Sequence, residues 1–84
     1  MTEPSATYRI LWRAIREHRQ VTFVQSKKFR QAYPVILGYS ADGEEALFAY
    51  QAGGHTSPGR TLPGWRCFRV EGIRDLTSHK GGWL

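Results

Sequence analysis

Residues 29–39, with the sequence FRQAYPVILGY, form a long run of alternating side chains that predicts a β-strand. Pro34 cannot donate a ladder hydrogen bond, so the strand must have an edge, a bulge or a sharp bend there. Gly38 permits a second bend. The alternation assigns these residues to two faces: Phe29, Gln31, Tyr33, Val35, Leu37 and Tyr39 to one, and Arg30, Ala32, Pro34, Ile36 and Gly38 to the other. Bends of this kind are what a small barrel requires.

The segment before this strand predicts a helix and a first strand. Apolar residues follow helical spacing from Tyr8 to about Arg19, with Thr7 as the N-cap. The residues assigned to the buried face are Tyr8, Leu11, Trp12 and Ile15, with Ala14 at its border. Arg9, Arg13 and Arg16 are interpreted as the solvated face of the same helix. A period of two over residues 21–26 predicts the strand that follows.

The segment after it predicts the rest of a sheet. Asp42-Gly43 is a hairpin signal, and strands are expected at about 45–52, 65–70 and 73–76. One helix and four or five antiparallel strands predict a mainly β (α+β) fold, a strongly bent sheet of the SH3- or Sm-like barrel type. At 84 residues the chain forms one domain. We expect a flexible leader at 1–7, the domain at 8–77 and a tail at 78–84.

Charge and composition point to an anionic partner. Twelve Lys and Arg against seven Asp and Glu give a net charge of +5, which favours phosphates, nucleic acid or an acidic protein surface. Cys67, the single cysteine, cannot form an internal disulfide. The sequence shows no signal peptide and no membrane-spanning run, so we expect a cytoplasmic protein without a membrane partner.

The strongest candidate site combines the loop at residues 53–64, which is rich in Gly and Pro, with the strand after it. Arg66 shares a strand face with Phe68, and a guanidinium there can bind a phosphate through two parallel hydrogen bonds. Alternatively, Arg66 holds the loop through backbone carbonyls. Arg30 follows the same logic, with a salt bridge to Glu44 or Glu45 as its alternative.

The other candidate ligand-binding residues are less specific. In the loop, His55 and Ser57 follow a glycine pair whose amides can form an anion-binding nest, or the loop binds nothing. Trp65 can stack on a base, or it is a structural residue of the core. Arg69 lies beside Phe68. Lys27, Lys28 and Arg60 can contact a phosphate backbone, or are solvated surface charges.

The order of these segments resembles the WYL domain, a small bacterial module. The resemblance rests on residues 11–15 (LWRAI), 19–23 (RQVTF), 30–34 (RQAYP), 47–50 (LFAY) and 66–70 (RCFRV), with Ile73 and Leu76. Of the Trp-Tyr-Leu motif that names the family, Leu47 alone is retained. The family resemblance implies an Sm-like barrel and a role in transcription regulation. It further implies binding of nucleotides or single-stranded nucleic acid, with Arg30, Arg66, Phe68 and Arg69 in the groove.

No catalytic or metal site is expected. The three histidines are far apart and Cys67 lies within a strand, so neither a nucleophile with its base nor a metal-ligand spacing is present. We therefore predict a non-enzymatic module without cofactor or metal, which senses a nucleotide or short single-stranded nucleic acid. The alternative is a protein-interaction or homo-oligomeric module that uses edge strands and the Trp83-Leu84 tail.

Overall fold

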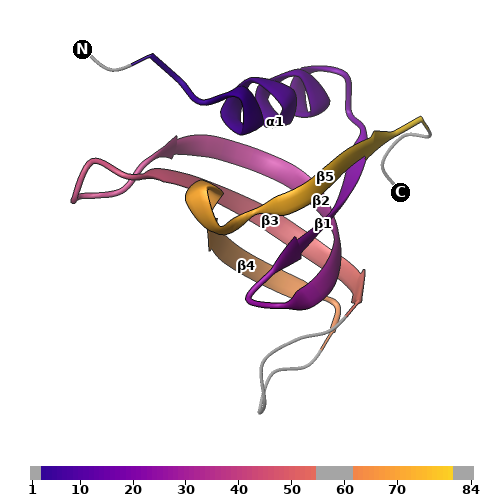
Figure 1. The fold of residues 1–84 in the computed structure, drawn as a ribbon. Coiled ribbons are helices and arrows are strands. Elements are labelled where there is room, and N and C mark those ends of the chain that lie inside the picture. The colour runs from indigo at the N-terminus through magenta and orange to yellow at the C-terminus, as the bar shows by residue number, and fades with distance from the viewer. Residues whose placement is uncertain (1–2, 55–61, 81–84) are drawn as a thin grey trace.

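The computed structural model describes residues 3–54 and 62–80 and is mainly β, as predicted (Figure 1). Its elements are α1 (Ala6–Arg16), β1 (Gln20–Gln25), β2 (Lys28–Tyr39), β3 (Glu45–Gly54), β4 (Gly64–Arg69), the 3-10 turn η1 (Val70–Gly72) and β5 (Arg74–His79). The strands form one antiparallel sheet in the order β4-β3-β2-β1-β5. Among the described residues, β4 and β5 do not pair with each other, so the sheet is not closed.

The long strand β2 contains the irregularity that Pro34 predicts. The register with β3 shifts between Pro34 and Ile36, which confirms a bulge. The unbroken alternation expected beyond it is wrong, because one extra residue exchanges the two faces. Ile36 is therefore paired with Phe48 and is 59% exposed, while Leu37 is paired with Leu47 and packs against the core.

The core lies on the inner face of the bent sheet, beneath α1. Figure 1 shows α1 across one side of the sheet, with β5 crossing in front of β2 and β3. Phe23 of β1 and Phe68 of β4 meet edge to face with ring centroids 5.1 Å apart. The other buried apolar residues are Leu11, Ala14, Val21, Ala32, Leu47, Ala49, Val70 and Ile73. Most of these come from alternate positions of the strands, as the period of two predicts.

Helix α1 differs from its prediction in its start and in its buried face. Ser5 is the N-cap in place of Thr7, because its hydroxyl accepts a hydrogen bond from the Tyr8 amide at 3.1 Å. Leu11 and Ala14 are the buried positions. The expectation that Trp12 is buried is wrong, since its side chain is 50% exposed. The small Ala14 at the contact lets the helix approach the sheet, and Trp12 then falls on the flank.

No helix in residues 3–54 and 62–80 is long and apolar enough to span a membrane.

Candidate functional site

Arg30 of β2 is a buried cation held by neutral groups. It is 1% exposed. Its Nη2 donates to Oε1 of Gln25 at 3.0 Å and to the Gln25 carbonyl at 3.4 Å, and its Nη1 donates to Oε1 of Gln51 at 3.5 Å. Gln51 is itself fully buried and donates to the Gly53 carbonyl at 3.0 Å. These hydrogen bonds orient the guanidinium without cancelling its charge.

The ion pair of Arg30 with Glu44 or Glu45, considered from the sequence, does not form. Arg30 pairs with Gly54 at one end of β3, and Glu45 lies at the other end, about 30 Å away along the strand. Glu45 instead accepts hydrogen bonds from the amide and the hydroxyl of Ser5. The length of β3 therefore keeps the buried Arg30 away from the acidic residues at the start of that strand.

Two arginines contact one aromatic ring. The Cζ atom of Arg30 lies 5.5 Å from the Phe68 ring centroid, and that of the half-buried Arg66 lies 5.7 Å from the same centroid. Both distances are within the range of a cation–π contact. Burial lowers the pKa of Arg30, and the nearby charge of Arg66 lowers it further. The two cations therefore repel each other, and an anion placed beside them would be stabilised.

We call Arg30 and Arg66 the arginine pair. The ends of several strands lie close to Arg30. Lys28 pairs with Gln25, the residue that accepts from Arg30, and so brings the Lys27-Lys28 turn to this end of the sheet. In Figure 1 the turn between β1 and β2 and the end of β3 lie at the same lower end. Gly54, with φ +87, allows the approach: a Cβ there would lie 2.3 Å from the Phe29 carbonyl oxygen.

Trp65 and Arg69 do not join the arginine pair, because alternation along β4 sends them to the outer face. Trp65 is 53% exposed and stacks on Phe48, with ring centroids 5.2 Å apart and planes 1° from parallel. Arg69 forms an ion pair with Asp42, with Nη2 3.0 Å from Oδ2. His55, Ser57 and Arg60 lie outside the described residues.

Gln25 and Gln51 were missed as site residues, although the sequence carries a signal for both. Each continues an alternating set whose other members are apolar and buried: Val21 and Phe23 before Gln25, and Leu47 and Ala49 before Gln51. A polar side chain at a core-facing position needs a hydrogen-bond partner. An arginine on the adjacent strand was the available donor.

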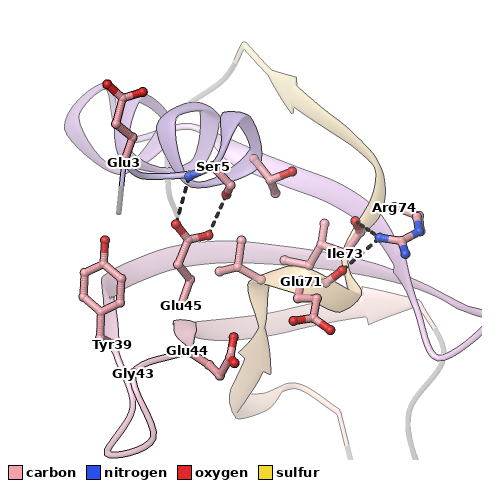
Figure 2. A pocket seen from close by; sticks show the side chains of 11 residues that line it. Glu3, Ser5, Tyr39, Gly43, Glu44, Glu45, Glu71, Ile73 and Arg74 are labelled. Carbon is pink, nitrogen blue, oxygen red and sulfur yellow. Dashed lines mark hydrogen bonds between the residues drawn. The ribbon is translucent and has the colours of Figure 1, made fainter. Parts of the chain in front are cut away.

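A hollow of about 580 Å³ lies at the opposite end of the sheet, beside the first turn of α1 (Figure 2). Four of the seven acidic residues line it: Glu3, Glu44, Glu45 and Glu71. Arg74 lies at its rim and donates to the carbonyls of Glu71 and Ile73. Within residues 3–54 and 62–80, no group of three acidic, histidine or cysteine side chains is placed to hold a metal ion. Its negative lining makes this hollow unsuited to an anion.

No protein-family model, no curated protein and no solved structure matches this chain. The WYL resemblance therefore stays a prediction from the sequence.

Proposed function

We propose that this chain is a ligand-sensing module that binds an anion, a nucleotide or a short single-stranded nucleic acid, at the arginine pair. The observation that carries the proposal is that the guanidinium groups of Arg30 and Arg66 both contact the ring of Phe68. A phosphate beside them would offset the repulsion between the two cations and accept charge-assisted hydrogen bonds.

The two arginines have different roles in this proposal. Arg30 is buried and oriented by Gln25 and Gln51, so it supplies a fixed positive charge. Arg66 is half-buried on the edge strand β4 and is the group that contacts the ligand. Phe68, 3% exposed, contacts both guanidinium groups. A preorganised site of this kind loses little side-chain entropy on binding.

The proposal includes the finer sequence-based predictions. The domain would be a divergent WYL-like module with an SH3- or Sm-like barrel, acting in the cytoplasm as a regulator rather than as an enzyme. The order of one helix followed by five strands supports the barrel assignment. The net charge of +5 supports an anionic partner.

The test compares Arg66→Ala with Arg69→Ala, which removes the same charge from the same strand but from its outer face. Fluorescence anisotropy would follow labelled six-nucleotide DNA and RNA, with unlabelled nucleoside mono- and triphosphates as competitors, at about 50 and 200 mM salt. We expect Arg66→Ala to weaken binding roughly 10-fold or more, with Arg69→Ala close to wild type. Equal losses in the two variants, or no binding by the wild type, would refute the proposal.

A protein partner, or a second copy, is the second candidate. The outer face of β2, β3 and β4 exposes Ile36 and Trp65, and β4 is a regular edge strand. The other edge, β5, is protected by the positive φ of Asp75 and by a register shift against β1. Trp83 and Leu84 lie outside the described residues. Sedimentation of wild type and Trp65→Ser would show a dimer that the variant loses, whereas a monomer at every concentration would exclude self-association.

A further inference from the structure

The exposed face of α1 carries an aromatic ring among arginines. At 100° per residue, Trp12, Arg16, Arg9 and Arg13 follow one another around the helix, opposite the buried Leu11. All four are exposed. We call these four residues the α1 stripe. It is separate from the arginine pair, which lies on the inner face of the sheet.

Trp12 lies at one side of the α1 stripe and supplies its aromatic ring. The Cζ atom of Arg16 lies 4.6 Å from its ring centroid, so a guanidinium covers one part of the indole. Trp12 also borders three hollows. The smallest, about 170 Å³, is lined by Pro4, Tyr8 and Arg9. The others, of about 280 and 550 Å³, extend along Arg13 and toward β5. A half-exposed indole with open space around it is available to a flat ligand.

The charge of the surface is positive. Arg19, three residues after the end of α1, joins the three arginines of the stripe, and the facing acids are Glu3 and Glu17. Glu17 lies 3.9 Å from Arg13 and 2.9 Å from Arg19, so it holds these two side chains beside the 550 Å³ hollow. Exposed ion pairs of this kind are weak and can be exchanged for a phosphate.

We propose that the α1 stripe binds single-stranded nucleic acid, with a base against Trp12 and phosphates at Arg9, Arg13 and Arg16. Surfaces that bind single strands combine a basic track with exposed aromatic rings, and this stripe has both. Arg9 and Arg16 are about 10 Å apart along the helix axis, the length of about three nucleotides in a stacked strand. The three arginines assigned from the sequence to solvent, together with Trp12, thus form a binding surface.

Two other anionic partners fit the stripe less well. A membrane surface binds a helix through its apolar face, but Leu11 and Ala14 of α1 are packed against the sheet. The carboxylate side chains of an acidic peptide would match the arginines but would bring no planar ring for Trp12. The presence of one exposed ring beside three cations therefore favours a ligand that offers both a base and several phosphates.

The test measures binding of a labelled 15-nucleotide single strand by fluorescence anisotropy in Trp12→Ala, Trp12→Phe and Arg16→Gln. All titrations are done in both the wild-type and the Arg66→Ala background, so that loss at the helix and loss at the arginine pair are measured separately. We expect Trp12→Ala to weaken binding by roughly 5- to 100-fold, and Trp12→Phe to retain most of the affinity. Arg16→Gln should reduce the slope of log K against log salt by about 0.7.

Arg69→Gln is the matched control, since it removes an exposed arginine that belongs to β4 and not to the stripe. The proposal is overturned if Trp12→Ala binds as Arg69→Gln does, or if Trp12→Phe loses as much affinity as Trp12→Ala. It is also overturned if the wild type binds a polyglutamate peptide or phosphatidylserine vesicles in preference to the oligonucleotide. Urea unfolding of each variant confirms that the fold is retained.

Discussion

Charged groups are paired differently at the two ends of the sheet. At the end where β3 begins, which we call the carboxylate end, acidic side chains have hydrogen-bond partners: Glu45 accepts from Ser5, and Asp42 accepts from Ser40 and Arg69. At the other end, where β3 finishes and which we call the cation end, Arg30 is oriented by neutral amides and faces the charge of Arg66. Glu45 links β3 to the start of α1, whereas the two arginines generate a positive potential. The distribution of charge, more than its net value, therefore indicates where a ligand would bind.

The largest expected effect comes from the backbone that builds the cation end. Gly54→Ala would place a Cβ 2.3 Å from the Phe29 carbonyl oxygen and 2.9 Å from the Arg30 Cα, at φ +87. We expect the free energy of unfolding to fall by about 3 kcal/mol or more. Gly43→Ala, in the turn at the carboxylate end, has a similar φ of +83 but no atom within 4 Å. It should lose only about 1 kcal/mol.

Urea denaturation measures both glycine variants. Gly38→Ala is the control, because it lies within β2 with open space around it and no positive φ. Similar losses at Gly54 and Gly43 would show that the close approach at the cation end does not matter to the fold.

The second effect separates the two arginines by stability. Arg30→Ala should lower the free energy of unfolding by about 2–4 kcal/mol, because it leaves a cavity and removes a hydrogen-bond donor from the buried Gln51 and the half-buried Gln25. Arg30→Met keeps most of the volume and should lose less. Arg66→Ala should lose under about 1 kcal/mol. Thermal unfolding would check these values, and a larger loss for Arg66→Ala than for Arg30→Ala would contradict the assigned roles.

The sheet could be predicted from the sequence because alternation reports directly on which residues face the core. Val21 and Phe23, and likewise Leu47 and Ala49, are buried as that pattern requires. Alternation could not predict that the bulge at Pro34 exchanges the faces beyond it, because one inserted residue changes no residue type.

Helix α1 shows a second limit. Helical spacing allows several adjacent arcs to be the buried one, and residue size alone favours the arc containing Trp12. The structure buries Ala14 instead, because close packing against the sheet selects the small residue.

For the candidate site, the alternation along β4 predicts Arg66 and Phe68 on one face. The contact of Arg30 with the same ring depends on how the sheet bends, which no local pattern contains.

A third effect tests the link between the carboxylate end and α1. Ser5→Ala removes the N-cap hydroxyl and a hydrogen bond to Glu45, and should lower the free energy of unfolding by about 1 kcal/mol. Thr7→Ala, at the cap position predicted from the sequence, should change it by a few tenths of that amount. Guanidinium titrations followed by circular dichroism measure both. An equal loss of stability in Thr7→Ala would show that the assignment of Ser5 as the N-cap is wrong.

The smallest effect is a titration at the carboxylate end. The hydrogen bond from Ser40, together with Arg69, lowers the pKa of Asp42 from 3.8 to about 2. Since the pKa is depressed on folding, the stabilisation is present above about pH 3.8 and is lost as the pH falls through about 2. Carboxyl carbon NMR shifts would report this pKa. Ser40→Ala should raise it, and a value near 3.8 in the wild type would contradict the contact.

The most direct test of the arginine pair is a titration of the arginine Nε–Hε NMR signals with a nucleoside triphosphate and with a six-nucleotide single strand. These signals report each guanidinium separately. Binding at the cation end predicts saturable shifts for Arg66 and Arg30, with Arg69 unchanged beside Asp42. Shifts at Arg69 with none at Arg66 and Arg30 would contradict the account.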